Sequence, residues 1–209
     1  MDVKERDTVV TTVEELVSLY AAPHERTLQK ETDRINAAGR AFIAASPFLI
    51  LATGSRQGLD CSPKGDKPGF VQVEDDGRTL LIPDRRGNNR LDGLKNLVED
   101  PRIGLIFLVP GAGETYRVNG RARISIDPAL RRRFTVDGKE PTTVIVVTVE
   151  QAFQHCPKAL VRSDLWSRGS GQRPKDVPTL GTFAAARDPA IDGAAYDAEY
   201  ATRVPKELY

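Results

Sequence analysis

The sequence has little of what marks disulfide-rich or membrane-spanning proteins. Its 209 residues include two cysteines, Cys61 and Cys156, which are too few for a disulfide framework. Its longest apolar stretches, residues 48–52 and 103–109, have the length of strands and are too short to cross a bilayer. The first residues lack the basic-then-apolar order of a signal peptide, so we expect a cytoplasmic protein.

The chain also has no large excess of positive or of negative residues. The chain carries 30 basic and 29 acidic residues, and a balanced charge gives no electrostatic reason to bind nucleic acid or a membrane. Aromatic residues make up 6% of the chain and do not alternate with basic ones, so no base-stacking platform is expected. We therefore expect no nucleic-acid or membrane partner.

The N-terminal part, residues 1–47, is predicted to be a helical extension. Apolar residues recur at helical spacing over residues 12–20, and Pro23 ends this pattern. A second helix is predicted over residues 24–46. It ends at Pro47, whose ring clashes with the preceding turn of a helix.

From residue 48 onward, short β-branched runs separated by turn residues predict strands. They are expected at residues 48–53, 59–64, 70–74, 79–84, 102–109, 115–125 and 142–153, with helices at 88–99 and 127–134. Hairpin-connected strands favour an antiparallel barrel over a parallel α/β sheet. We predict a mainly β fold, a β-barrel with peripheral helices, over residues 48–166. Residues 167–209 are predicted to be a loop and tail that pack on the barrel or partner subunit, with a short helix ending at Pro205.

The segment IPDRRGNNRLDGLKNLVEDPR carries the first candidate site. A strand ends at IPD, a basic loop follows, and a helix is predicted to begin near Asn88. Free backbone N–H groups and the helix dipole make such a start an anion site. Arg90, with Arg85 or Arg86, could neutralise a phosphate. The alternative is that Asn88 caps the helix and the arginines are solvated.

The segment DCSPKGDKPG carries the second candidate site. Pro63 removes a ladder donor, which is typical of an edge strand. An open edge beside Gly65 lets a planar heterocycle approach the backbone. Ser62, Lys64 and Asp66 would add side-chain donors and acceptors. The alternative is an ordinary bulged edge strand with a polar turn.

Groups for other kinds of catalysis are not apparent. Cys61 is interpreted as a small core residue and not as a nucleophile, because neither His24 nor His155 has the sequence context of a base. No Ser-His-Asp set, paired carboxylates or metal-spaced His/Cys cluster is recognised. We therefore predict no catalytic side chain with certainty and no metal.

Four segments in order resemble a known family. They are FLILATGS, DCSPKGDKPGFVQV, LLIPDRRGNNRLDGLKNLVEDPRIGLIFLVPG and ETYRVNGRARI. Over about residues 12–166 they resemble the pyridoxamine 5′-phosphate oxidase-like FMN-binding split barrels, and HCPKALVRSDLW resembles the branch of FMN-dependent enzymes of that class. The resemblance implies an antiparallel six- to seven-stranded FMN-binding split barrel with N-terminal helices, and a homodimer with FMN at the subunit interface.

The resemblance also implies where FMN is bound. In that family, polar and basic residues between a strand end and the next helix hold the flavin phosphate. The matching positions are Asn88, Asn89 and Arg90, together with Arg86. The isoalloxazine ring would lie along residues 62–66.

The remaining implied positions surround the ring. Pro83 and Asp84 would lie near it, and Arg117 would reach the cofactor from the adjoining strand or from the partner subunit. Residues of HCPKALVRSDLW would close the pocket. The full implied set of cofactor-binding residues is Ser62, Pro63, Lys64, Gly65, Asp66, Pro83, Asp84, Arg86, Asn88, Asn89, Arg90, Arg117, Lys158, Arg162 and Trp166.

The activity that the resemblance implies is FMN-dependent oxidoreduction, with two electrons passing between FMN N5 and a small-molecule substrate. Reduced nicotinamide or dioxygen would complete the cycle. Lys64 or Lys158 near the flavin N1–C2 edge would stabilise the anionic reduced form by charge attraction. Pyridoxamine-phosphate oxidases end with an Arg- and His-containing strand that residues 194–209 do not match, so a vitamin B6 substrate is not expected.

Two alternatives belong to other functional classes. The barrel could be a non-catalytic flavin- or haem-binding carrier or sensor, and haem would require His24 or His155 as a ligand. It could also be a ligand-free interaction scaffold whose apolar strands form a dimer. A deazaflavin in place of FMN is a further alternative, because related split barrels use one.

Overall fold

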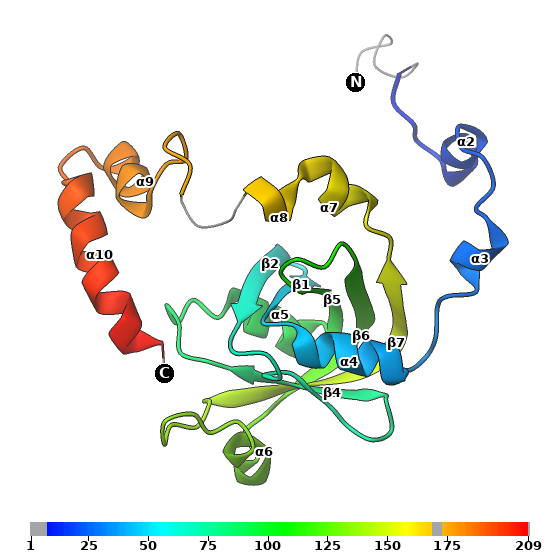
Figure 1. Ribbon diagram of the computed structural model, residues 1–209, viewed down its shortest axis with the longest axis horizontal. Coiled ribbons are helices and arrows are strands. Elements are labelled where there is room, and N and C mark those ends of the chain that lie inside the picture. The colour runs from blue at the N-terminus through cyan, green and yellow to red at the C-terminus, as the bar shows by residue number, and fades with distance from the viewer. Residues whose placement is uncertain (1–7, 169–172, 209) are drawn as a thin grey trace. The chain divides into compact units, whose positions relative to one another are not determined.

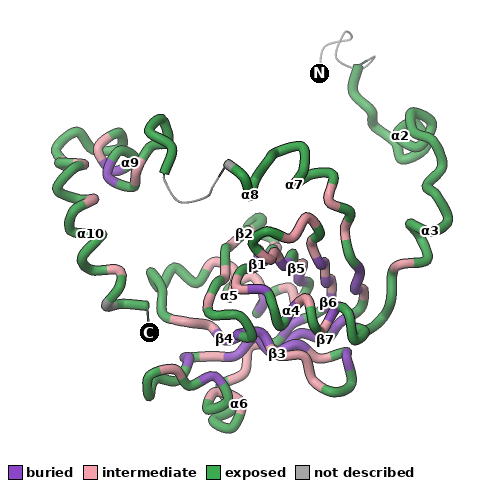
Figure 2. Tube along the Cα trace, in the orientation of Figure 1, coloured by how far each residue is buried: buried purple, intermediate pink, exposed green. Residues whose placement is uncertain are grey.

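The computed structural model describes residues 8–168 and 173–208, and contacts within the chain divide it into two units, Met1–Glu31 and Thr32–Tyr209. The first unit contains α2 (Val13–Ser18) and α3 (Glu25–Leu28). Thr12 begins α2 through a capping box, since its hydroxyl accepts a hydrogen bond from the Glu15 amide at 3.1 Å. None of the described residues of this unit is buried (Figure 2). Its helices therefore contribute nothing to a hydrophobic core.

The second unit is built on a seven-stranded antiparallel sheet in the order β2-β1-β5-β6-β7-β4-β3 (Figure 1). The strands are β1 (Phe48–Ser55), β2 (Gly58–Gly65), β3 (Gln72–Val73), β4 (Thr79–Asp84), β5 (Arg102–Leu108), β6 (Thr115–Ser125) and β7 (Thr143–His155). Strands β2 and β3 end the sheet, and among the described residues no ladder joins the two ends. The fold is a split barrel, so the predicted mainly β class is confirmed.

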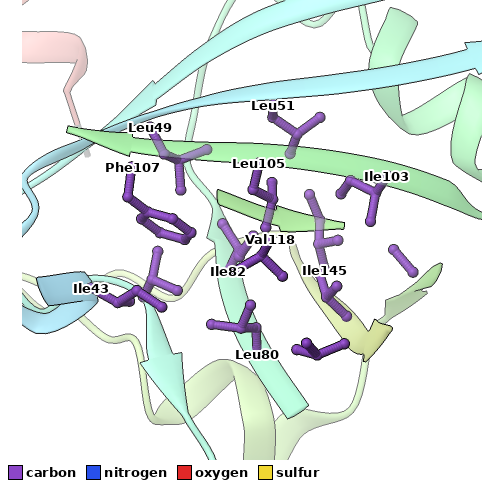
Figure 3. Packing of buried hydrophobic residues seen from close by; sticks show 14 of the residues in the cluster. Ile43, Leu49, Leu51, Leu80, Ile82, Ile103, Leu105, Phe107, Val118 and Ile145 are labelled. Atoms are coloured by element: carbon purple, nitrogen blue, oxygen red, sulfur yellow. The ribbon is translucent and has the colours of Figure 1, made fainter. Parts of the chain in front are cut away.

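Alternating side chains along the strands build the core. Leu51 of β1 stands opposite Leu105 of β5, which in turn stands opposite Val118 of β6, and all three are buried. Because successive side chains of a strand point to opposite faces, such rows place one apolar face of the curled sheet inside. Figure 3 shows these side chains meeting between the strands. The interior also includes Ile43, Leu49, Leu80, Ile82, Ile103, Phe107 and Ile145.

Three helices cover the sheet. Helix α4 (Ala37–Ala45) packs on β6 and β3, α5 (Asp92–Glu99) packs on β1, β2 and β6, and α6 (Pro128–Arg132) packs on β7. The chain then forms α7 (Lys158–Ser163), α8 (Leu165–Arg168), α9 (Leu180–Arg187) and α10 (Gly193–Glu207). Within the residues described, no helix is both long and apolar enough to cross a bilayer.

Helices α9 and α10 contact one another through two glycines. A Cβ at Gly181 would overlap the carbonyl of Gly193, and a Cβ at Gly193 would lie 2.7 Å from the Gly181 oxygen. Any larger residue at either position would push the two helices apart. The tail thus contains two helices where one short helix was expected, and α10 continues through Pro205.

The prediction of one helix over residues 24–46 is wrong. The backbone of Thr32 exchanges hydrogen bonds with Ala152 of β7, and the Ile35 amide donates to the Gly77 oxygen at 2.7 Å. These contacts hold the chain between α3 and α4 in a non-helical conformation. Pairing with the sheet therefore overrides the helical spacing of the apolar residues.

Candidate functional site

A cavity of about 550 Å³ opens between β2 and the end of β4. Its volume lies in the range of small-molecule sites, roughly 300–1,000 Å³. It is lined by β2, the end of β4, the loop that follows β4, and the first turn of α5. The lining residues are Leu51, Asp60, Ser62, Pro63, Lys64, Gly65, Phe70, Pro83, Asp84, Arg85, Arg86, Gly87, Asn88, Asn89, Arg90, Leu91, Asp92, Gly93, Leu94 and Ile145.

Strand β2 supplies a polar wall. Asp60, Ser62 and Lys64 pair in register with buried residues of β1, so the three side chains share the inner face of the sheet. The Ser62 hydroxyl donates to the Asp60 carboxylate at 2.6 Å. Strand β2 ends the sheet, so in the part of the chain that the structure describes its outer edge pairs with no further strand. Asp60, Ser62 and Lys64 all line the cavity.

The end of β4 forms the opposite wall. Asp84 lies on the same inner face as Leu80 and Ile82, and its Oδ1 atom is 2.6 Å from Lys64 Nζ. The Lys64 side chain is 25% exposed and that of Asp84 is 13% exposed. The charge of Lys64 is therefore already balanced by a carboxylate within the cavity.

The loop after β4 brings a helix start to the cavity. Leu91 precedes α5 with a φ of 60°, and no side chain caps the helix at this residue. The Asn88 carboxamide oxygen instead accepts from the Arg90 amide at 3.1 Å. Neither the predicted helix start near Asn88 nor an Asn88 cap is therefore correct, because α5 begins at Asp92. Without a side-chain cap, its first amides remain available to an anion.

The arginines near the loop differ in their partners. Arg85 Nε is 2.8 Å from Asp66 Oδ2, and Arg90 Nε is 2.6 Å from Asp92 Oδ2. For Arg86, which is exposed and lines the cavity, no ion pair is found among the residues that the structure describes. Arg86 is thus the arginine of this loop whose charge is not committed to a carboxylate.

The polar walls meet an apolar floor. Leu51, Phe70 and Ile145 are buried core residues that also line the cavity, and Leu94 of α5 adjoins them. A planar ring would bury apolar surface against these side chains while its polar edge faced β2. One cavity therefore combines an apolar surface, hydrogen-bonding groups and an anion-attracting loop.

The structure brings together ten of the fifteen residues predicted to bind a cofactor. Those that line the cavity are Ser62, Pro63, Lys64, Gly65, Pro83, Asp84, Arg86, Asn88, Asn89 and Arg90. Asp66 lies outside the lining and is bound to Arg85, which does line it. The two sequence segments are thus neighbours in space, while their contacts with a cofactor stay a prediction.

The other four predicted residues lie outside the cavity of their own chain. Arg117 lies on the outer face of β6, with its guanidinium carbon 5.6 Å from the centre of the Phe153 ring. Trp166 Nε1 donates to the Ala112 oxygen at 2.6 Å. Lys158 and Arg162 are exposed on α7. Their contact with a cofactor bound by a second subunit stays a prediction.

The sequence interpretation missed several lining residues. Asp60 could have been found, because it alternates with Ser62 and Lys64 along one strand. The sequence did not mark Leu51 and Ile145 as lining residues, since other inner positions of their strands are apolar in the same way. Cys61 is exposed on β2, so its assignment to the core is wrong. Neither histidine lines the cavity, and within the described part of the chain no group of three metal-ligating side chains occurs.

Comparison with known proteins shows the family to which the chain belongs. The family profile described as pyridoxamine 5′-phosphate oxidase matches residues 35–156, which is more than half of the chain and contains every lining residue. The chain belongs to the pyridoxamine 5′-phosphate oxidase family. The predicted family is therefore confirmed. No curated protein matches the sequence.

Solved structures similar to this family member include HupZ of Group A Streptococcus, at 21% identity and a TM-score of 0.46, over 57% of this chain and 93% of that chain. A Clostridium acetobutylicum protein related to general stress protein 26 is 14% identical with a TM-score of 0.43, over 57% and 86% of the two chains. An F420 reductase is 16% identical with a TM-score of 0.39, over 56% and 94%.

Proposed function

We propose that this member of the pyridoxamine 5′-phosphate oxidase family is an FMN-dependent oxidoreductase. The observation that carries the proposal is the cavity between β2 and β4, where an uncapped helix start and the uncommitted Arg86 adjoin an apolar floor. These features fit the two chemically different ends of FMN, a phosphate and a flat ring. The family membership supports the same conclusion.

The residues divide between these two ends. The amides at the start of α5, with Arg86 and Asn89, would bind the phosphate through charge-assisted hydrogen bonds. The Ser62 hydroxyl and the backbone of Gly65 on the end strand would bind the polar edge of the ring. Phe70 would contact the ring itself. FMN, when bound, would supply two-electron redox chemistry, for which the protein provides position and electrostatics.

The Lys64–Asp84 pair gives this site its electrostatic character. Because the two side chains are 2.6 Å apart, they present a nearly neutral dipole to the cavity and not a free ammonium group. Lys64 Nζ retains two further protons that can donate hydrogen bonds to an oxygen or nitrogen of the ring. Lys64 is therefore proposed as a hydrogen-bond donor held in place by Asp84.

The test begins with the absorbance spectrum of the purified protein, followed by titration with FMN. We expect a flavin spectrum and saturable binding. Arg86→Gln is expected to weaken FMN binding about ten- to hundred-fold, because a charged hydrogen bond is worth about 1.5–3 kcal/mol. The matched control is Arg132→Gln on α6, whose side chain is exposed and outside the cavity. A colourless protein that does not bind added FMN would contradict the proposal.

Turnover is tested separately from binding. If the protein is an oxidoreductase, NADH or NADPH should reduce the bound flavin and dioxygen should reoxidise it over many cycles. Binding without such cycles would instead support a carrier or sensor. A deazaflavin or a haem has an absorbance spectrum distinct from that of FMN, so the first measurement also separates these cofactors.

We also propose a homodimer, on the character of the outer face of β1, β5 and β6. Phe48 and Ile106 are apolar residues that are 38% and 37% exposed on this face, and Ile50 lies between them in register with Ile106. Arg117 adjoins Ile106 on the next strand. A second subunit on this face would bury these side chains and bring Arg117 to the interface.

A further inference from the structure

Two ion pairs cross the barrel where its backbone does not close. In the sheet order, β2 and β4 are separated by four strands, and among the described residues they share no ladder. Their side chains nevertheless meet, because Lys64 of β2 contacts Asp84 of β4 at 2.6 Å. Arg85, which directly follows β4, contacts Asp66, which directly follows β2, at 2.8 Å. The curled sheet is thus joined by side chains at this end.

The second pair is fixed more firmly than a surface ion pair. The Arg85 and Asp66 side chains are 16% and 4% exposed, so water screens their attraction poorly. Arg85 Nη1 also donates to the Phe134 oxygen at 2.6 Å. The Asp66 amide donates to the Pro47 oxygen at 3.1 Å, which ties it to the start of β1. Both partners are therefore anchored to other parts of the fold.

We infer that these four side chains form a latch that sets the distance between the two walls of the cavity. Lys64, Asp84 and Arg85 line the cavity themselves, and Asp66 holds Arg85 from behind. Loss of one partner leaves an unbalanced, partly buried charge, which drives the walls apart and admits water. Asp84 and Asp66 are then positioning residues for the ligand. Of the two measurements that test this inference, only FMN binding rests on the proposed function.

Exchanging the two residues of the Lys64–Asp84 pair distinguishes a latch from direct recognition of the ligand by Lys64. Lys64→Met and Asp84→Asn each remove one partner, while Lys64→Asp combined with Asp84→Lys restores an ion pair of opposite direction. The first measurement is hydrogen exchange in the ligand-free full-length protein, over β2 and residues 85–91. We expect each single variant to speed exchange in both segments about tenfold, and the reversed pair to return most of this protection.

The second measurement is the dissociation constant of FMN, followed by flavin fluorescence. Each single variant should weaken FMN binding about tenfold, and the reversed pair should bind FMN more tightly than Lys64→Met does, although it lacks the hydrogen-bond donor of Lys64. Asp100→Asn is the matched control, because its partner Arg102 is exposed and the pair lies outside this cavity. We expect the control to change neither measurement.

Several outcomes overturn the latch. One is unchanged exchange in the single variants, and another is exchange that the reversed pair does not restore. If the reversed pair restores exchange but binds FMN no more tightly than Lys64→Met does, the direct hydrogen bond from Lys64 accounts for the whole loss and Asp84 is not a positioning residue. If the single variants do not fold, Lys64→Arg keeps the charge of the ion pair, so its exchange in both segments should stay within about twofold of the parent protein, and faster exchange contradicts the latch. If the parent protein does not bind FMN, the proposed function fails while the exchange measurement still decides the latch.

Discussion

Single residues in the loop after β4 adopt an uncommon backbone conformation. Asn89 and Leu91 have φ values of 58° and 60°, in the left-handed region that non-glycine residues rarely enter. For a residue such as leucine this conformation costs roughly 1–2 kcal/mol. Both residues line the cavity. Strain of this kind concentrates at functional sites, where the surrounding structure maintains it.

The strain at Leu91 predicts the effect of a substitution. Leu91→Gly should raise the free energy of unfolding by up to about 1 kcal/mol, because glycine adopts this φ without a steric cost. Lys95→Gly is the control in the ordinary part of α5, and it should lower that free energy by about 1 kcal/mol. Urea denaturation measures both. Equal destabilisation by the two substitutions would show that Leu91 is not strained.

At the scale of elements, α4 packs closely against a side chain of β6. Gly39 of α4 faces the phenol ring of Tyr116 on β6, and a Cβ at this glycine would overlap the ring. The Asn36 carboxamide begins the helix by accepting from the Gly39 amide at 2.9 Å. Burial raises the pKa of Tyr116, because the ionised phenol would lose its hydration. The position of α4 on the sheet therefore depends on the absence of a side chain at residue 39.

This contact predicts that Gly39→Ala lowers the free energy of unfolding by about 1–3 kcal/mol, the range for an overpacked contact. In a Tyr116→Leu background the same substitution should cost less, because the shorter side chain leaves room for the methyl group. Chemical denaturation of the four proteins of this cycle measures the difference. An equal cost in both backgrounds would mean that the ring is not what excludes a side chain.

At the scale of the whole molecule, the outer face of the sheet carries partly exposed apolar side chains on β1 and β5, Phe48 and Ile106. Ile50, Ile106 and Arg117 form a row across three strands, and Phe153 of β7 extends it. The guanidinium of Arg117 lies over the Phe153 ring, which makes that part of the row amphipathic. Apolar surface with a polar rim is typical of a protein interface.

The proposed homodimer predicts a mass near twice the chain mass of 22.9 kDa in light scattering coupled to gel filtration. Ile106→Glu should reduce the measured mass to that of one chain, because it would bury an unpaired charge in the interface. Ile126→Glu is the control, since Ile126 is 73% exposed and lies outside the row. Dimers that persist in Ile106→Glu would place the interface elsewhere.

Much of the fold was predictable because the strands carry local patterns. The expected strands at residues 79–84 and 115–125 agree with β4 and β6 at both ends. The prediction of one helix over residues 24–46 was wrong, since the partner of Thr32 lies on β7 and that of Ile35 in the turn before β4, and a local pattern contains neither.

The two candidate segments of the site were visible in the sequence, because proline, glycine and charged residues interrupt otherwise apolar strands. Alternation and turn residues act between near neighbours, so the sequence by itself determined the strands, their inner faces and the polar character of β2 and the loop after β4. The curvature of the sheet, which is a property of the tertiary structure, determined that Lys64 forms an ion pair with Asp84 and Asp66 with Arg85. It also decided that Arg86, unlike Arg85 and Arg90, forms no ion pair with the residues that the structure describes. These contacts join the ends of β2 and β4, which four strands separate in the sheet order, and their distances depend on the twist accumulated over every strand between them.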